Sequence, residues 1–345
     1  MKRLPLLLVA LGLVASSACG SGGDDGPPAG SGSAGGSASE AASGTFPVTI
    51  EHRFGDTTIE SEPERVVSVG FTDQDPLLAL GIVPVGIRDW YGDQPNAVWP
   101  WAQDLLGGEE PEVLSAEEIN AEAIAALEPD LIVGVSSGMT EEEYDTLSQI
   151  APTLAQSGDY VDYGMPWQEG TRMIGEAVGR PDEAEAMVAD VEARLAAARR
   201  ANPGFEGAEA TVSYVMDETS IGAYSPEDTR SRLLTDLGMV IPQEIADLAG
   251  DQFYSQFSKE QIAVLDRDLI VWIAGEPGIE DQVRQDPLHG RLRAAAEGRE
   301  VFLTQMEAGA ASFSSVISLP YLLDSLVPRM AAAVDGDPAT PVPAG

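Results

Sequence analysis

The sequence predicts an α/β protein built from two wound α/β lobes joined by a single long helix. One observation is an internal repeat: residues 121–133 (AEAIAALEPDLIV) and 259–271 (KEQIAVLDRDLIV) share eight of thirteen positions at a constant offset of 138 residues. Each copy has apolar residues at helical spacing and ends in an apolar run typical of a strand covered on both faces. The other observation is that strands and helices alternate through both halves of the chain, as in wound parallel sheets.

The N-terminus predicts export. Residues 1–19 hold two basic residues, an apolar run that is shorter than the ~20 residues of a membrane span, and then small residues before Cys19. This segment resembles a bacterial lipoprotein signal, although Ser16 stands where leucine is usual. Cys19 is the only cysteine, so we expect lipidation there and no disulfide within the chain. An ordinary secretory signal with a stray cysteine is the alternative.

The predicted domains follow in order along the chain. Residues 20–45 are rich in Gly and Ser and predict a flexible tether. An N-terminal lobe is expected over 46–180, with a strand at 65–70, a helix at 73–81, a strand at 83–87, the first repeat, and a helix after 139 in which Thr140 is the N-cap and Glu143 completes a capping box.

The second half begins with the linking helix, predicted over 181–203 because acidic residues lead and arginines trail, as the helix dipole favours. A single helix between lobes is stiff, so we expect no large hinge closure. The C-terminal lobe is expected over 204–335, followed by a disordered tail over 336–345. Its predicted elements are a strand at 210–216, a helix at 229–238, the second repeat, a strand at 299–304 and a helix at 316–334.

The composition excludes several classes of partner. With 57 acidic and 19 basic residues the formal net charge is −38, which disfavours binding to nucleic acid or to an anionic membrane surface. The chain has only two histidines, His52 and His289, so a His-rich site for a bare metal ion is not expected. The acidity itself indicates either a high-salt habitat or an acidic secretome from a GC-rich genome.

The candidate binding residues lie at predicted strand ends, where open α/β folds bind ligands. Three of the five tryptophans fall within twelve residues of one loop, without helical spacing. We therefore expect an aromatic cleft. Its candidate residues are Arg88, Trp90, Tyr91, Trp99, Trp101, Ser136, Met139, Tyr163, Tyr224, Arg230, Tyr254, Trp272 and Phe313, with Tyr160, Trp167, Arg232, Phe253 and Phe257 as further positions.

The element order, the linking helix, the segment RVVSVGFTDQDPLLALGIVPVGI and the paired helix-strand units resemble the substrate-binding lipoproteins of ABC importers for ferric siderophores, haem and vitamin B12. The resemblance covers roughly residues 46–335 and implies the two-lobed class III substrate-binding fold. It implies a monomer without cofactor or enzyme activity, anchored outside the cell membrane, that hands a ferric siderophore to a permease dimer with its ATPase. It also implies that Glu122 and Glu260 dock onto the two permease subunits.

The identity of the ligand stays open at this point. Hydroxamate chelates suit tryptophans, catecholates need local arginines, and haem or a corrinoid is an alternative of the same fold. A serine hydrolase is a distant alternative, because Gly134-Val135-Ser136-Ser137-Gly138 matches the G-x-S-x-G pattern of a nucleophile elbow, with His289 as the only later histidine.

Overall fold

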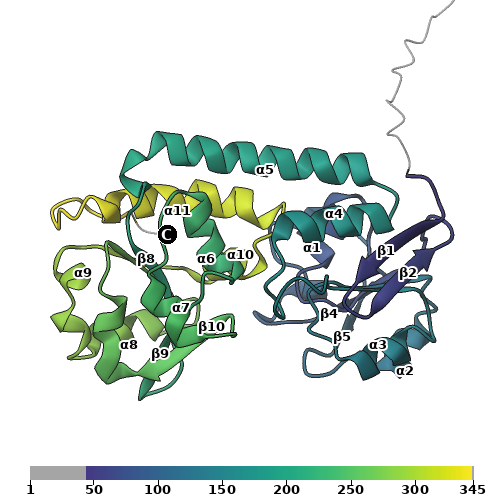
Figure 1. Ribbon diagram of the computed structural model, residues 1–345, viewed down its shortest axis with the longest axis horizontal. Coiled ribbons are helices and arrows are strands. Elements are labelled where there is room, and N and C mark those ends of the chain that lie inside the picture. Colours follow the sequence, from purple (N-terminus) through teal and green to yellow (C-terminus); the bar gives the residue numbers. More distant parts are fainter. Residues whose placement is uncertain (1–43, 344–345) are drawn as a thin grey trace, which may run out of the picture. The chain divides into compact units, whose positions relative to one another are not determined.

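The computed structural model describes residues 44–343, and Figure 1 shows their arrangement. The N-terminal lobe is built on a five-stranded parallel sheet in the order β5-β4-β3-β6-β7, preceded by the antiparallel hairpin β1-β2. The strands are β1 (Val48–His52), β2 (Gly55–Ile59), β3 (Val66–Ser68), β4 (Gly86–Arg88), β5 (Glu112–Leu114), β6 (Leu131–Gly134) and β7 (Thr153–Ala155). The helices are α1 (Gln74–Ala79), α2 (Ala121–Ala126), α3 (Glu141–Leu147) and α4 (Trp167–Ala177), with 3-10 turns η1 (Pro95–Ala97) and η2 (Gln103–Leu106).

The C-terminal lobe has a mixed sheet in the order β10-β9-β8-β11-β12, in which β9 runs antiparallel to both of its neighbours. Its strands are β8 (Ala210–Val215), β9 (Ser220–Tyr224), β10 (Tyr254–Ser258), β11 (Leu269–Ile273) and β12 (Glu300–Phe302). Its helices are α6 (Thr229–Asp236), α7 (Gln243–Ala249), α8 (Ile279–Gln285), α9 (Arg293–Ala296), α10 (Gln305–Phe313) and α11 (Ser318–Val334), with 3-10 turns η3 (Pro203–Phe205), η4 (Lys259–Leu265) and η5 (His289–Arg291).

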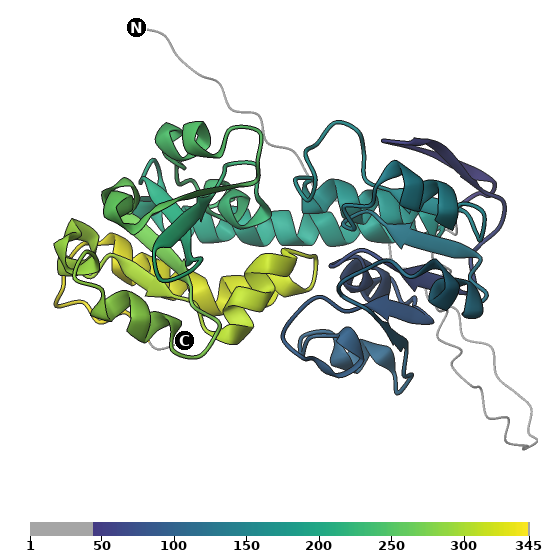
Figure 2. The same ribbon diagram turned by 90° about the horizontal axis from the view of Figure 1, so that it is seen from below.

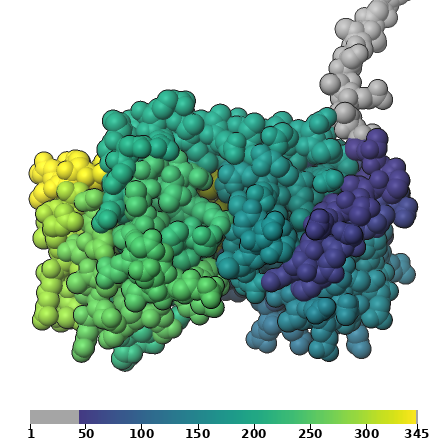
Figure 3. Space-filling view, viewed as in Figure 1, coloured from purple at the N-terminus to yellow at the C-terminus, as the bar shows by residue number. Residues whose placement is uncertain are grey.

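A single long helix, α5 (Pro181–Ala201), connects the two lobes. It packs on α4 of the first lobe and on α6 and α11 of the second, and Figure 2 shows it passing along both. Ala184, Val188, Val191 and Leu195 form its buried stripe, and the other positions hold mainly acidic residues, arginines and alanines. Pro181 at the first helical position has no N–H to leave unsatisfied, which favours a helix start there. In Figure 3 the two lobes meet along a seam beneath this helix.

The repeated segments fold into helix-strand units, but the two copies differ in helix type. The first forms the α-helix α2 and then β6, whereas the second forms the 3-10 helix η4 and then β11. The side chain of Asn120 accepts a hydrogen bond from the third helical N–H of α2. Ser258, the last residue of β10, instead accepts from Glu260 N, so η4 begins directly at a strand end. The predicted capping box of α3 is present, with Thr140 and Glu143 bonded reciprocally.

The two predicted flexible segments both contact the lobes where they enter the described residues. Gly44, expected to belong to the tether, donates its N–H to Gly179 O at 2.7 Å. The predicted disordered tail packs Val342 against the C-terminal core, and Arg329 Nε donates to Pro343 O at 3.1 Å. A half-buried apolar side chain and a buried guanidinium therefore hold this tail. Residues 1–43, with the predicted signal, Cys19 and most of the tether, lie outside the described residues.

Candidate ligand-binding pocket

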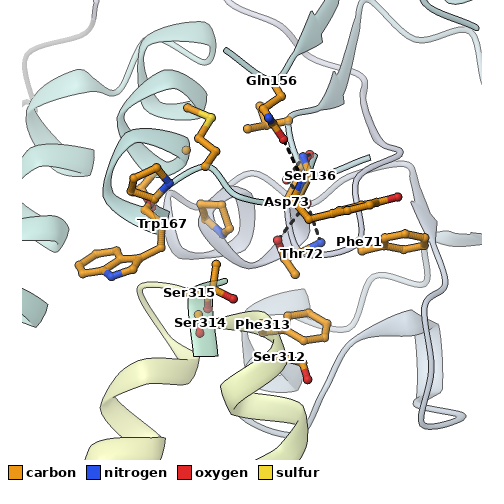
Figure 4. A pocket seen from close by; sticks show the side chains of 18 of the residues that line it. Phe71, Thr72, Asp73, Ser136, Gln156, Trp167, Ser312, Phe313, Ser314 and Ser315 are labelled. Carbon is orange, nitrogen blue, oxygen red and sulfur yellow. Dashed lines mark hydrogen bonds between the residues drawn. The ribbon is translucent and has the colours of Figure 1, made fainter. Parts of the chain in front are cut away.

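A cavity of about 320 Å³ lies between residues of the two lobes, and Figure 4 shows it from close by. In the N-terminal sheet the chain builds β3, β4 and β5 toward one edge and then crosses back to β6, so the strand order reverses between β3 and β6. Side chains just beyond the carboxyl ends of such strands diverge and leave a crevice. Phe71, Thr72 and Asp73 follow β3, and Val135 and Ser136 follow β6; all five line the cavity.

The wall from the N-terminal lobe is a hydrogen-bonded group of Asp73, Ser136 and Thr72. Ser136 Oγ donates to Asp73 Oδ1 at 2.6 Å, and Ser136 N donates to the same carboxylate at 3.1 Å. Thr72 N and Oγ1 donate to Ser136 Oγ at 3.1 and 2.9 Å. Burial raises the pKa of Asp73 to about 6, against the lowering effect of the Ser136 hydrogen bonds. This network ties the two strand-end loops together around a buried carboxylate.

The opposite wall is centred on Arg230, at the start of α6. Its Nη1 forms a 2.9 Å ion pair with Asp228, the N-cap of α6, and its Nε donates to Ser312 Oγ at 3.2 Å. Its guanidinium lies over the ring of Tyr224, 4.3 Å from the centroid. The side chain of Arg230 is therefore held in one orientation by a carboxylate, a hydroxyl and an aromatic face.

Aromatic side chains supply most of the remaining surface of the cavity. Phe71 stacks on Trp90 at 5.4 Å between ring centroids and on Tyr163 at 6.0 Å, and Trp90 packs against Phe313 at 5.6 Å. Flat rings from both lobes thus form a continuous apolar lining. The six aromatic residues of the lining are Phe71, Trp90, Tyr163, Trp167, Phe253 and Phe313.

Five of the thirteen candidate residues predicted from the sequence line the cavity: Trp90, Ser136, Tyr163, Arg230 and Phe313. Two further positions, Trp167 and Phe253, line it as well. Tyr224 stands behind the lining, where its ring supports Arg230. Tyr254 is paired with Tyr224 across β9 and β10, and neither Tyr254, Tyr160, Phe257 nor Arg232 belongs to the lining.

Arg88 lies behind the aromatic lining. Phe71 covers its guanidinium, with the carbon of that group 4.3 Å from the ring centroid. Its Nη2 donates to Ala116 O at 3.0 Å, and its Nη1 lies 3.5 Å from Val69 O and Ser137 O. Burial lowers the pKa of Arg88. This arginine is thus used inside the N-terminal lobe and does not face the cavity.

The other expected residues of the tryptophan loop join the lobes instead of lining the cavity. Trp99 is 1% exposed and stacks on Trp101 at 5.0 Å. Trp101 Nε1 donates to Asp75 Oδ2 at 2.9 Å, and Tyr91 Oη donates to Ala308 O of the C-terminal lobe at 3.2 Å. These side chains were expected to contact a ligand because their spacing does not fit a helix. An irregular loop that packs between two lobes has the same irregular spacing, so the sequence pattern does not distinguish the two cases.

Met139 and Trp272 belong to the cores of their own lobes. Met139 is 4% exposed within the N-terminal core, and Trp272 is 1% exposed and donates Nε1 to Glu300 at 2.7 Å. Trp272 was expected at the cavity because it lies near the end of a strand. That strand, β11, is buried on both faces, and the side chain of Trp272 packs within the core instead.

Several lining residues were missed by the sequence reasoning. Phe71, Thr72 and Asp73 directly follow the predicted strand 65–70, so the rule that open α/β folds bind ligands beyond strand ends could have found them. Ser312, Ser314 and Ser315 gave no comparable signal, because the break between α10 and α11 at Ser314, which has a φ of 43°, does not show in the sequence pattern. The other missed residues are Pro76, Val135, Gln156, Met165, Pro166, Gly170, Thr171, Ile174, Asp228 and Thr229.

The geometry gives no support to a hydrolase. His289 Nε2 bonds to Glu300 at 2.9 Å inside the C-terminal lobe, and His52 Nε2 bonds to Thr57 at 2.8 Å. Ser136 Oγ instead contacts Asp73 and Thr72, so it lacks the histidine that a nucleophile elbow requires. Within residues 44–343 no three His, Cys, Asp or Glu side chains gather as a metal site would require, and no helix there is long and apolar enough to cross a membrane.

The chain is similar to known proteins over most of the described residues. A family profile described as periplasmic binding protein matches residues 67–306. The probable siderophore-binding lipoprotein YfiY of Bacillus subtilis is 31% identical over 236 residues, 65% of this chain and 68% of that protein. The Fe(3+) dicitrate-binding periplasmic protein FecB of Escherichia coli is 30% identical over 251 residues, 72% and 80% of the two chains. A periplasmic solute binding protein from Mycobacterium smegmatis has a similar crystal structure, with TM-score 0.76 and 36% identity over 83% of this chain and 98% of that one.

Proposed function

The chain belongs to the periplasmic binding protein family, and from that membership we propose that it captures a ferric siderophore outside the cytoplasm and delivers it to the permease of an ABC importer. The aromatic cavity between the lobes carries this proposal. Its volume of about 320 Å³ lies within the range of small-molecule sites, and apolar rings with few polar groups are typical of their linings. The names of the relatives from B. subtilis and E. coli, a siderophore-binding and an Fe(3+) dicitrate-binding protein, support iron as the cargo.

Arg230 is the residue that we expect to touch the iron-coordinating oxygens. Two of its nitrogens are bonded, to Asp228 and Ser312, while Nη2 donates to no acceptor among the described residues. A donor fixed by its neighbours costs little entropy when it binds a ligand oxygen. The rings of Trp90, Trp167 and Phe313 then cover the organic part of the chelate. Iron thus arrives as part of the ligand and leaves with it, and no chemical step takes place.

A binding titration tests this function. Tryptophan fluorescence of residues 45–345 is measured against ferric hydroxamates, a ferric catecholate, haem, cobalamin and free metal ions, at a fixed salt concentration. We expect saturable quenching by a ferric chelate and weaker quenching by its iron-free form. Saturation by haem or cobalamin alone contradicts the siderophore assignment and supports the other ligands of this fold. A response to free metal ions alone contradicts both.

Docking onto the permease is proposed for Glu122 in α2 and Glu260 in η4. Both side chains are exposed, and neither forms an ion pair with another described residue. They occupy equivalent places in the repeated segment, so the two lobes present the same charge to a two-fold partner. Exchange of both for arginine should abolish stimulation of the transporter's ATPase while leaving ligand affinity unchanged. Replacement of Glu192 and Glu218, which are also exposed, by arginine is the matched control. This double variant should still stimulate the transporter's ATPase.

Anchoring is proposed to follow from acylation of Cys19, with the segment up to residue 45 as the tether. The proposal rests on the sequence alone. Labelling of the expressed protein with a radioactive fatty acid should be lost in Cys19→Ser, which should also be released from the membrane fraction. Membrane retention of the unlabelled variant contradicts this mode of anchoring.

A further inference from the structure

The cavity contains an uneven set of charges. Its ionisable lining groups, apart from Tyr163, are Asp73, Asp228 and Arg230. Asp228 and Arg230 form a 2.9 Å ion pair and neutralise each other. Asp73 has no cationic partner among the described residues, since its hydrogen bonds come from Ser136. The lining therefore carries one unpaired charge, and that charge is negative.

The other two arginines that were expected to help with an anionic ligand are used elsewhere. Arg88 lies beneath the ring of Phe71 and donates to backbone carbonyls. Arg232 donates to Gly164 O and to Glu227, and none of these three residues belongs to the lining. The cavity thus has no second cation with which to match a ligand of several negative charges.

Ferric chelates differ strongly in charge. Three hydroxamate groups, each with one negative charge, neutralise the ferric ion, and a free ammonium makes the complex cationic. Three catecholates leave the complex with three negative charges. Between charges in a partly buried site the Coulomb energy is several-fold larger than in water, so each added negative charge near Asp73 weakens binding by roughly tenfold or more.

We propose that Asp73 is a specificity-determining residue that excludes strongly anionic ferric chelates, so that the ligand is a neutral or cationic chelate such as a ferric trihydroxamate. This inference rests on the proposed siderophore function. The six aromatic rings of the lining suit such a ligand, because ring faces attract cations and pack on uncharged organic groups. The E. coli relative is named for Fe(3+) dicitrate, so the two proteins are expected to differ in this respect.

Asp73 also has a structural role, and the test must separate that role from the effect of its charge. Its carboxylate holds the loop after β6 through the N–H and hydroxyl of Ser136. Asn has nearly the same shape, and its single oxygen can accept from both the N–H and the hydroxyl of Ser136. Asp73→Asn therefore removes the charge and gives up only the second, 3.2 Å contact of Ser136 N with Oδ2. Asp236→Asn is the matched control: Asp236 is a half-buried aspartate on α6, outside the lining, and its replacement changes the net charge equally.

The experiment measures dissociation constants at physiological ionic strength for a neutral ferric trihydroxamate, a cationic one with a free ammonium, and a ferric tricatecholate. For the unaltered protein we expect the tricatecholate to bind at least about a hundredfold more weakly than the tightest trihydroxamate. In Asp73→Asn the tricatecholate should gain about tenfold or more, the cationic chelate should lose affinity, and the neutral one should change little. Asp236→Asn should alter none of the three.

The outcomes separate this inference from the proposed function. If the tricatecholate binds as tightly as the trihydroxamates, or if Asp73→Asn shifts all three chelates by the same factor, Asp73 does not select by charge, while siderophore binding still stands. If no ferric chelate binds, the proposed function fails as well. Circular dichroism of both variants shows whether a uniform loss comes from unfolding.

Discussion

Ser315 Oγ in the C-terminal lobe donates a 2.5 Å hydrogen bond to Asp75 Oδ2 in the N-terminal lobe. Trp101 Nε1 donates to the same oxygen at 2.9 Å. Asp75 is fully buried, and its Oδ1 has no hydrogen-bond partner within residues 44–343. The contact lies beside the cavity, because Ser315 also belongs to the lining. One buried carboxylate thus joins the tryptophan loop, α1 and the turn before α11.

Ser315→Ala is expected to destabilise the protein. The change removes the hydroxyl that donates to Asp75 and leaves the carboxylate with Trp101 as its only donor. The same hydroxyl accepts from Ile317 N and Ser318 N, which also lose this acceptor. Together these losses should cost about 1 to 3 kcal/mol in unfolding free energy. Urea unfolding followed by circular dichroism measures this loss. Ser148→Ala, at an exposed position, is the control and should unfold like the unaltered protein. Equal midpoints for the two variants would show that the hydrogen bonds of Ser315, the one between lobes included, contribute nothing.

Asp75 should also make the stability depend on pH. Burial raises its pKa to about 7 in the folded protein, far above the value of an exposed aspartate, against the lowering effect of the Ser315 and Trp101 hydrogen bonds. Between about pH 4 and pH 7 the folded state therefore binds a proton that the unfolded state has lost. Unfolding free energy should fall as pH rises through this window, by up to about 1.4 kcal/mol per pH unit from this group.

Asp75→Asn isolates that contribution, because Asp73 and Asp236, whose pKa values burial also raises to about 6, titrate in both proteins. Urea midpoints are measured for the unaltered protein and the variant at several pH values from 4 to 8. The stability of the unaltered protein relative to the variant should decline toward high pH. A difference that does not change with pH contradicts a raised pKa for Asp75.

Gly309→Ala should destabilise the protein although alanine favours helices. Gly309 lies in α10, and a Cβ there would stand 2.5 Å from the Trp99 ring of the other lobe. Overpacking of this kind typically costs about 1 to 3 kcal/mol, which exceeds the gain of about 1 kcal/mol from helix propensity. Thermal unfolding of Gly309→Ala and of Gly290→Ala, where a Cβ meets open space, measures the difference. A stabilised Gly309→Ala would mean that the lobes separate easily at Trp99.

Arg230→Lys should weaken ligand binding more than it weakens the fold. Lysine keeps a cation beside Asp228 but has no planar fork with which to bond Asp228, Ser312 and a ligand oxygen together. The loss of one charge-assisted hydrogen bond predicts about a tenfold or larger increase in the dissociation constant of the ferric chelate. Arg291→Lys, an exposed position, is the control. Unchanged affinity in Arg230→Lys would remove this residue from the binding site.

The two lobes and the helix between them could be predicted from the sequence. A repeated apolar strand and a long amphipathic helix both leave a pattern in neighbouring residues, which can be recognised without knowledge of distant contacts. The mixed order of the second sheet was not predicted: β9 and β10 are short antiparallel strands with serine and glycine, and their pairing depends on neighbours far along the chain. Trp90 and Trp99 show the same limit within the site. Both stand in one irregular loop, yet one ring faces the cavity and the other fills the interface with α10.

Phe71→Ala is expected to change the charge preference of the cavity. The Phe71 ring lies between the cavity and Arg88, whose guanidinium carbon is 4.3 Å from the ring centroid. Removal of the ring gives a ligand access to a second cation, so the affinity for a ferric tricatecholate should rise relative to that for a neutral trihydroxamate. Phe71→Leu keeps an apolar cover over Arg88 and serves as the control. Because both variants lose aromatic contact with the ligand, the ratio of the two dissociation constants is the quantity to compare. A ratio that moves equally in both variants would show that Arg88 stays inaccessible to the ligand.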